Sequence, residues 1–370
     1  MQYYADLHIH SLFSMATSKS MTPALLLAAA ARKGIGILGS GDALHPMWRA
    51  MWKDTDDTEI LVVPSAEVED RFRIHHLLLM EDFDGFAELS ERLSGYGKSV
   101  TTNGRPHVSL SGGEIAAEVH ELGGLIGPAH AFTPWTSLYA SCDRISDCYG
   151  SEPVDFLELG LSADSSYGAA IPELAGIPFL SNSDAHSPQP LKVGREFNRI
   201  AVGKRTAQGL LDAVSRGKIT LNAGFFPEEG KYNRTACIGC FRHYTLSEAE
   251  AFHWRCPVDK KRIKKGVRDR ACELSAGTTG SRPPYLHIIP LQEIIRQMLG
   301  TASPATKACN AVYERLLAHF NTEIEVLVTA SIDEIERIDP GVANAVDCLR
   351  SGRIVLHPGG GGRYGSFSLG

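Results

Sequence analysis

Short apolar runs that alternate with helix-like stretches fill the first 225 residues, and they constrain the fold of this chain more than any other feature. Thr22-Pro23 is typical of the cap and first position of a helix over 24–33, and Ser111 or Gly112 opens a second helix pattern over 114–122. Repeated β-α units predict a parallel sheet, either open or closed into a barrel. The expected strands are 36–40, 60–64, 74–80, 124–128, 155–159 and 178–181.

Histidines and carboxylates follow most of these runs, beginning with His8 and His10 after the opening run. Residues i and i+2 of a strand point to the same side, so the two imidazoles are spaced to bind one metal ion. An isolated pair would more simply be one buried and one surface histidine, but here nitrogen and oxygen ligands recur at strand ends, where a β/α barrel builds its active site. The pattern predicts two or three divalent metals of the zinc, manganese, magnesium or iron class. The candidate ligands are His8, His10, Asp42, His45, Glu67, His76, His130, Asp184 and His186.

The expected chemistry is hydrolysis of a phosphate ester. Metals about 4 Å apart can activate a water and stabilise both the attacking and the leaving oxygen at phosphorus. Glu67 has two oxygens with which to bridge two metals, and Asp184 and His186 repeat the i, i+2 spacing. We expect these three residues to carry the catalysis, with amide hydrolysis as the alternative on chemistry alone.

The same motifs resemble those of the PHP (polymerase and histidinol phosphatase) phosphoesterase superfamily. The resemblance implies a distorted β/α barrel, usually with three metals, and favours His76 over His75 as a ligand. Ala43 stands where that family usually has a histidine, and His45 lies two positions further on. We expect Asp6 to orient a ligating histidine rather than to bind metal itself.

A second resemblance covers nearly the whole chain. Residues 14–21, 180–188, 194–196 and 263–266 resemble the endonuclease Q family, in which a PHP barrel is joined to a small zinc module and a helical C-terminal part. This resemblance implies nicking of DNA on the 5′ side of deaminated bases (hypoxanthine, uracil, xanthine) and of abasic sites, leaving a 3′-hydroxyl. DNA with these lesions is the implied partner, and a replication clamp is left open as a second one.

A cysteine segment begins near residue 226. Cys237, Cys240 and Cys256 have the spacing of a zinc ribbon in which Asp259 stands for the fourth thiolate. Cys272 or His253 could take that fourth place instead, or the metal could be lost; a structural zinc is favoured because so small a module seldom folds without one.

A basic run follows the cysteines directly. Between residues 231 and 282, twelve lysines and arginines accompany five acidic residues, although the whole chain has a net charge of -6. Such a run is usually a solvated surface, but beside a phosphoesterase it favours contact with a phosphate backbone. The candidate DNA-binding residues are Lys19, Lys260, Lys261, Arg262, Lys264, Lys265 and Arg268.

The length of 370 residues predicts more than one domain. We expect a barrel over 1–225, a basic zinc module over 226–282 and a mostly helical domain over 283–370. No apolar run is long enough to span a bilayer, no signal peptide starts the chain, and the thinly spread cysteines favour a reducing compartment, the cytoplasm.

The combined prediction is a lesion-directed, metal-dependent DNA endonuclease. A small-molecule phosphatase is the first alternative, but it would need neither a zinc module nor a basic run. A non-catalytic DNA-binding scaffold is the second, and the nearly complete set of metal ligands argues against it.

Overall fold

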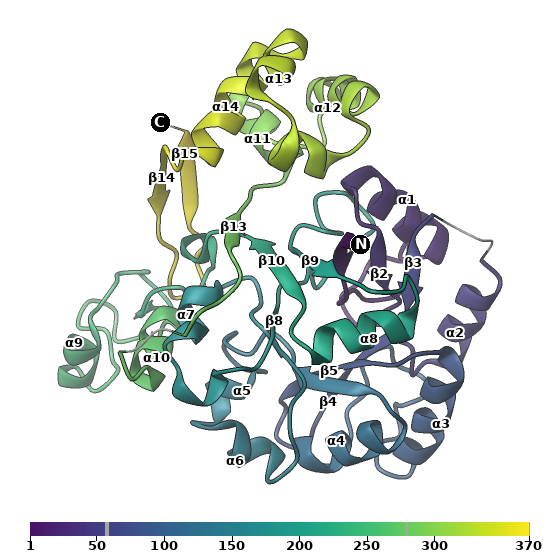
Figure 1. Cartoon of the computed structure of the whole chain (residues 1–370). Helices are drawn as coiled ribbons and strands as arrows, with labels where there is room; N and C mark the ends of the chain where they lie inside the picture. The colour runs from purple at the N-terminus through teal and green to yellow at the C-terminus, as the bar shows by residue number, and fades with distance from the viewer. Residues whose placement is uncertain (56–58, 278–279, 370) are drawn as a thin grey trace.

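The computed structural model describes residues 1–55, 59–277 and 280–369, which form a mixed α/β fold (Figure 1). Its largest sheet has six strands in the order β13-β10-β9-β1-β2-β3. The strands β1, β2 and β3 are parallel, whereas β9 runs antiparallel to both β1 and β10. The bounds are β1 Gln2–Asp6, β2 Ile37–Gly39, β3 Leu61–Val63, β9 Phe197–Ala201, β10 Ile219–Gly224 and β13 Tyr285–His287.

Two smaller sheets complete the first part of the chain. The strands β4 (Ser65–Glu69), β5 (His75–Leu79) and β6 (Leu125–Pro128) form an antiparallel sheet, and β7 (Leu157–Glu158) pairs in parallel with β8 (Phe179–Leu180). The prediction of a parallel sheet is therefore wrong for β4–β6 and for β9–β10. Only the five residues 70–74 join β4 to β5, and a parallel crossover needs a dozen or more.

The strand ladders of the described residues do not run continuously around a barrel. Single contacts join the separate sheets instead. Asp155 N–H donates to Ile126 O (2.9 Å) between β6 and β7, and Ile9 forms an isolated bridge with Ala185 beyond the ends of β1 and β8. These contacts bring the ends of β1, β4, β6 and β8 toward one place.

Helices cover the sheets and bury apolar side chains against them. The second predicted helix is α4, where Ser111 and Glu114 form a capping box. Leu26 and Ala30 of α1 belong to the same apolar cluster as Leu38 of β2, and Leu210 of α8 belongs to a second cluster with Ile37. The helices of this part are α1 Pro23–Lys33, α2 Pro46–Lys53, α3 Phe83–Ser94, α4 Gly112–Glu121, α5 Leu138–Ser141, α6 Ile145–Tyr149, α7 Ser165–Ala169 and α8 Ala207–Ser215.

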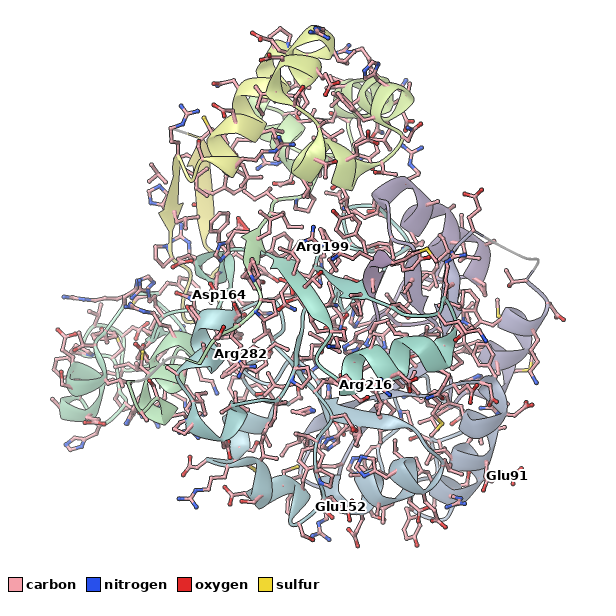
Figure 2. The ribbon with its side chains drawn as sticks, viewed as in Figure 1. Glu91, Glu152, Asp164, Arg199, Arg216 and Arg282 are labelled. Carbon is pink, nitrogen blue, oxygen red and sulfur yellow. The ribbon has the colours of Figure 1, made fainter. Side chains whose placement is uncertain are left out.

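The cysteine segment forms a small unit on one side of the molecule, around α9 and α10 (Figure 1). Its core consists of the side chains of Tyr244, Ala249 and Ile263 with two cysteines. Arg282 leads the chain back to the main body, where its guanidinium lies 3.6 Å from the ring centre of Phe179 (Figure 2). The elements of the unit are β11 Ala236–Cys237, α9 Leu246–Ala251, β12 Ile263–Lys264 and α10 Val267–Leu274.

The C-terminal part has four α-helices around its own apolar core, followed by a hairpin. It is fixed to α1 by a buried ion pair between Lys33 Nζ and Glu323 Oε1 at 2.7 Å. Tyr313 Oη and Leu291 N–H also donate to Glu323, so the buried carboxylate is fully partnered. The elements are α11 Leu291–Met298, α12 Lys307–Phe320, α13 Ile332–Ile338, α14 Pro340–Arg350, β14 Ile354–His357 and β15 Ser366–Leu369.

A glycine tract between β14 and β15 packs backbone to backbone against the cysteine unit. Gly361 has φ +65°, and a Cβ atom there would lie 2.2 Å from the carbonyl oxygen of Cys237. Only glycine permits this approach. Within the described part of the chain, no helix has the length and apolar character needed to cross a membrane.

Candidate metal centre

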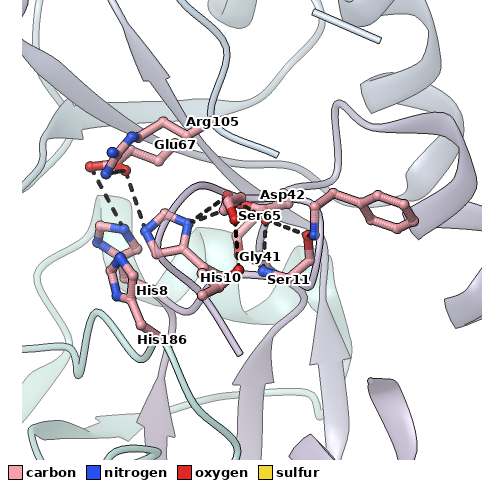
Figure 3. A network of polar contacts seen from close by, with 12 residues as sticks. His8, His10, Ser11, Gly41, Asp42, Ser65, Glu67, Arg105 and His186 are labelled. Carbon is pink, nitrogen blue, oxygen red and sulfur yellow. Dashed lines mark hydrogen bonds and ion pairs between the residues drawn. The ribbon is translucent and has the colours of Figure 1, made fainter. Parts of the chain in front are cut away.

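His8 and His10 lie just beyond the end of β1, and both are buried. A hydrogen bond from His10 N–H to Ala185 O (3.0 Å) fixes this segment beside the one that carries Asp184. His8 Nε2 lies 3.8 Å and His10 Nε2 3.1 Å from Asp184 Oδ1 (Figure 3 shows the two histidines). Neither Nε2 atom has a hydrogen-bond partner among the described residues. Buried nitrogens directed at one carboxylate oxygen fit a metal ion as their missing partner.

A second group adjoins the first around Glu67 of β4. Glu67 Oε1 lies 2.8 Å from His75 Nδ1 on β5 and 2.9 Å from His130 Nε2 just beyond β6. The other oxygen, Oε2, lies 3.4 Å from His10 Nε2 in the first group. Glu67 is thus placed between the two ligand groups, where its carboxylate could reach a metal in each.

Two buried carboxylates orient the histidines of the first group. Glu158 lies 2.9 Å from His8 Nδ1, and Asp42 lies 3.0 Å from His10 Nδ1. Each histidine therefore donates from Nδ1 and presents Nε2 to the centre, a common arrangement behind metal ligands. Asp42 also accepts hydrogen bonds from Ser11 N–H and Ser14 Oγ, so it is an orienting residue here and not the predicted ligand. The sequence analysis missed Glu158.

The structure places two predicted ligands outside the centre. His76 follows His75 on β5 and points to the opposite face of the strand, where it lies with Asp70 and Cys148. The preference for His76 over His75 is therefore wrong. His45 stacks on Phe13 with ring centres 3.9 Å apart and belongs to none of the ligand groups found among the described residues.

Two further predictions concern the loop that carries Asp184. His186 lies at the rim with 34% of its side chain exposed, and its ring centre is 4.6 Å from that of His10. Its Nδ1 atom lies 3.6 Å from Asp184 Oδ1. Asp6 accepts hydrogen bonds from Ser183 N–H (3.0 Å) and Gly194 N–H (2.8 Å). Asp6 therefore supports this loop. The expectation that it orients a ligating histidine is wrong.

Three residues of the centre have left-handed backbone. Asp42, His130 and Asp184 have φ of +46°, +32° and +45°, which residues other than glycine rarely adopt. Such conformations persist where the surrounding structure imposes them, often at functional sites.

The electrostatics of the centre keep its carboxylates ionised. Burial alone would raise the pKa of Glu67, but the nearby His75 and His130 outweigh it and hold that pKa well below its usual range. Burial alone would lower the pKa of His8, but Glu158, Glu67 and Asp184 together raise it to about 9. The centre thus has the charge pattern of a cation site, in which buried carboxylates favour the protonated form of His8 when metal is absent.

Arg105 is a further residue of the centre that the sequence analysis missed. Its Nη1 atom lies 3.2 Å from Glu67 Oε2, and only 25% of its side chain is exposed. It comes from the segment between α3 and α4, which carries no metal-ligand pattern. A fixed guanidinium beside the ligands can bind an anionic group such as a phosphate.

A cleft of about 910 Å³ opens from the centre. Four candidate ligands line it: His75, His130, Asp184 and His186. Its walls come from all parts of the chain: Trp135 from the first part, Lys231 and Tyr232 from the start of the cysteine unit, and Arg296 and Tyr364 from the C-terminal part. The position of the cleft allows a large substrate to contact all three parts at once.

Comparison with known proteins identifies the family. The lesion-specific endonuclease PfuEndoQ from Pyrococcus furiosus is 42% identical, with a TM-score of 0.96 over 100% of this chain and 96% of that chain. An endonuclease Q bound to a 27-mer duplex substrate with an abasic lesion at the active site is also 42% identical, with a TM-score of 0.94 over 100% and 97% of the two chains. This chain belongs to the endonuclease Q family.

Sequence relatives of this chain match over different lengths. The uncharacterized protein YqxK of Bacillus subtilis is 31% identical, and the match covers 98% of each chain. The uncharacterized protein MJ0043 of Methanocaldococcus jannaschii is 45% identical over 65% of this chain. The match covers only 31% of the length of MJ0043. Residues 290–353 match the family of the MJ0043 C-terminal domain.

The cysteine unit holds a separate ligand group. Ligand atoms of Cys237, Cys240, Cys256 and Asp259 lie within 4.8 Å of one another. The Sγ atoms of Cys240 and Cys256 are 3.6 Å apart, and Cys237 Sγ lies 3.2 Å from Asp259 Oδ1. This arrangement fits a zinc ion with Asp259 as fourth ligand. The alternatives, Cys272 and His253, are exposed and lie outside this group.

Some of the predicted DNA-binding residues are exposed, and others already contact a neighbouring side chain. Lys260, Lys261, Arg262 and Arg268 are exposed on the cysteine unit, and Lys19 is exposed on the loop after β1. Lys264 Nζ lies 3.5 Å from the ring centre of Trp135 at the cleft wall, and Lys265 is paired with Glu273 at 2.6 Å. Lys265 is therefore less available to a phosphate than its neighbours.

Proposed function

We propose that this chain is a lesion-specific DNA repair endonuclease whose metal centre hydrolyses the phosphodiester on the 5′ side of the lesion. The observation that carries the proposal is the pair of adjoining ligand groups, some of whose members line a cleft with walls from all three parts. It is supported by full-length similarity to an endonuclease Q that binds a duplex with an abasic lesion at its active site.

His8, His10 and Asp184 would hold one divalent metal, and Glu67, His75 and His130 a second, with His186 within reach at the rim. When bound, such metals supply Lewis acidity and an activated water for displacement at phosphorus. Glu158 and Asp42 hold protons on the Nδ1 atoms of His8 and His10 and so leave the Nε2 lone pairs free. Arg105 offers a fixed positive charge to the scissile phosphate.

The cleft supplies the selectivity for damaged nucleotides. An enzyme that reads one altered base must take the nucleotide out of the stack, and a lesion lowers the free energy needed by a few kcal/mol. Trp135 and Tyr232 line the cleft and offer aromatic faces on which a base can stack. We extend the substrate range from abasic sites to hypoxanthine, uracil and xanthine, in which a carbonyl replaces the exocyclic amine.

The exposed basic residues Lys260, Lys261, Arg262 and Arg268 would contact the phosphate backbone beside the lesion. Such contacts release counterions, so affinity for DNA falls steeply with salt. A replication clamp as a second partner stays a prediction.

We also infer that the three sheets act as arcs of one distorted β/α barrel. The contacts between β6 and β7, and between Ile9 and Ala185, support this view. The division into a barrel over 1–225, a basic zinc module over 226–282 and a helical domain over 283–370 belongs to the same proposal.

The test uses end-labelled duplexes that carry one deoxyinosine, one deoxyuridine, one abasic site or no lesion, with Mg²⁺ or Mn²⁺ present. We expect a single nick 5′ of each lesion, none in the undamaged duplex and none with EDTA. If no duplex were nicked while small phosphate esters released phosphate, the chain would be a small-molecule phosphatase instead.

A further inference from the structure

A third buried ligand group lies behind the metal centre. It consists of Asp70, His76 and Cys148, whose ligand atoms lie within 4.8 Å of one another. His75 and His76 are successive residues of β5, so one points to the centre and the other points away from it. The side chains of Asp70 and His76 are fully buried, and Cys148 of α6 is 4% exposed.

Two members of this group use one atom for orientation and place a second atom near the rest of the group. Tyr149 Oη lies 2.6 Å from His76 Nδ1. The N–H groups of Phe72 and Ile74 both donate to Asp70 Oδ1 at 2.8 Å. His76 Nε2 has no hydrogen-bond partner among the described residues, although it is fully buried. Such a nitrogen indicates a missing partner.

The remaining contacts within the group are one weak thiol hydrogen bond and one long N···O separation. His76 Nε2 lies 3.4 Å from Asp70 Oδ2, whereas a charged N–H···O pair closes to about 2.7–2.9 Å. The Cys148 thiol donates a weak hydrogen bond to the same oxygen, with Sγ 3.7 Å away. Tetrahedral zinc with its usual bond lengths to nitrogen, oxygen and sulfur has ligand–ligand edges of about 3.4 Å for N···O and about 3.6 Å for S···O. The group thus has the separations of ligands around a metal.

We propose that Asp70, His76 and Cys148 bind a structural zinc ion that is separate from both the metal centre and the cysteine unit. A mixed set of imidazole, carboxylate and thiolate ligands suits zinc. Gly112, the first residue of α4, closes the site, because a Cβ atom there would lie 2.7 Å from Cys148 Sγ and 2.8 Å from His76 Cε1. The ion would connect β5, the turn after β4 and α6, and so fix the strand that carries His75.

The test measures metal content of the full-length protein by mass spectrometry of the elements. Asp70→Asn keeps an oxygen for Phe72 and Ile74 but removes the charge, and Cys148→Ala removes the thiolate. We expect each variant to lose about one zinc per chain relative to the wild type. Cys348→Ala, at a buried cysteine of α14 outside every ligand group, is the matched control and should keep the full amount.

A second readout identifies the ligand. After replacement of zinc by Co²⁺, Cys148→Ala should lose part of the sulfur-to-cobalt charge-transfer absorption, while Cys348→Ala keeps it. If Asp70→Asn and Cys148→Ala fold, as judged by circular dichroism, and keep the wild-type zinc content, the proposal is overturned. If Cys148→Ala does not fold, the zinc content of Asp70→Asn decides alone.

Discussion

The metal centre and the cysteine unit differ in how the chain assembles them. The ligands of the centre come from positions between residues 8 and 184 and meet only when four segments are in place, whereas those of the cysteine unit lie within residues 237–259. The centre has buried orienting carboxylates and an open cleft. None of the four ligands of the cysteine unit lines that cleft. A local ligand set can stabilise a small unit, while a non-local set can leave an open side for a substrate.

Removing a ligand from the centre should have the largest effect. Asp184→Asn takes the negative charge from the oxygen on which His8 and His10 converge. We expect the nicking rate to fall by roughly 10³-fold or more, with DNA affinity nearly unchanged. Single-turnover nicking and fluorescence anisotropy measure the two quantities. Asp212→Asn, on the exposed face of α8, is the control, and nicking by Asp184→Asn within tenfold of the wild type would contradict the assignment.

Removing a ligand from the cysteine unit should affect folding of that unit and not the chemistry. Cys256→Ser loses one of three thiolates, and we expect about one zinc per chain to be lost because metal binding and folding of a small module are linked. Zinc content and the accessibility of the unit to protease report the change. Cys348→Ser tests for general effects of losing a buried cysteine. A stable, protease-resistant unit without zinc would show that its small apolar core suffices.

Altering an orienting residue should have an intermediate effect. Glu158→Gln keeps the shape of the side chain but weakens its pull on the Nδ1 proton of His8. Loss of such a partner typically lowers metal affinity by about 10–100-fold. Titration against a metal-binding dye measures the affinity. Glu91→Gln, at the periphery of the molecule (Figure 2), is the control and should match the wild type.

The smallest expected effect is on stability and depends on pH. Burial raises the pKa of Glu196 from 4.5 to about 8, so the folded state prefers the neutral acid. The stability that the folded state gains from the neutral acid is fully present below about pH 4.5 and is lost as the pH rises to about 8. Glutamine stays neutral at every pH. The free energy of unfolding of Glu196→Gln should therefore exceed that of the wild type by about 2–4 kcal/mol at pH 9, and by less at pH 5.

Chemical unfolding at pH 5, 7 and 9 measures this difference. Glu91→Gln again serves as the control, since its carboxyl group is exposed. A difference between Glu196→Gln and wild type that did not change with pH would mean that Glu196 is ionised in the folded protein.

Much of the centre could be predicted from ligand types at strand ends. His8, His10, Glu67, His130 and Asp184 come together as their spacing indicated. The choice between His75 and His76 could not be predicted because a shift of one residue in β5 reverses which histidine faces the centre.

Other features depend on contacts between distant segments. Glu158 is 150 residues from His8, and no local pattern links the two. Arg105 comes from an irregular segment without any strand or helix signal. A short turn joins β4 to β5, and this turn makes the two strands antiparallel. The sequence analysis did not identify β4, so the pairing is seen only in the structure. Local patterns thus gave the ligand types, and the fold decided their partners.

One experiment tests the central claim that the centre performs the chemistry while the basic unit holds DNA. Nicking of an abasic duplex is measured at saturating protein for the wild type, Asp184→Asn and the triple variant Lys260→Ala/Lys261→Ala/Arg262→Ala. We predict that the triple variant nicks at close to the wild-type rate but binds DNA more weakly and with a shallower salt dependence, whereas Asp184→Asn binds normally and does not nick. A triple variant without activity at saturation, or an active Asp184→Asn, would contradict this account.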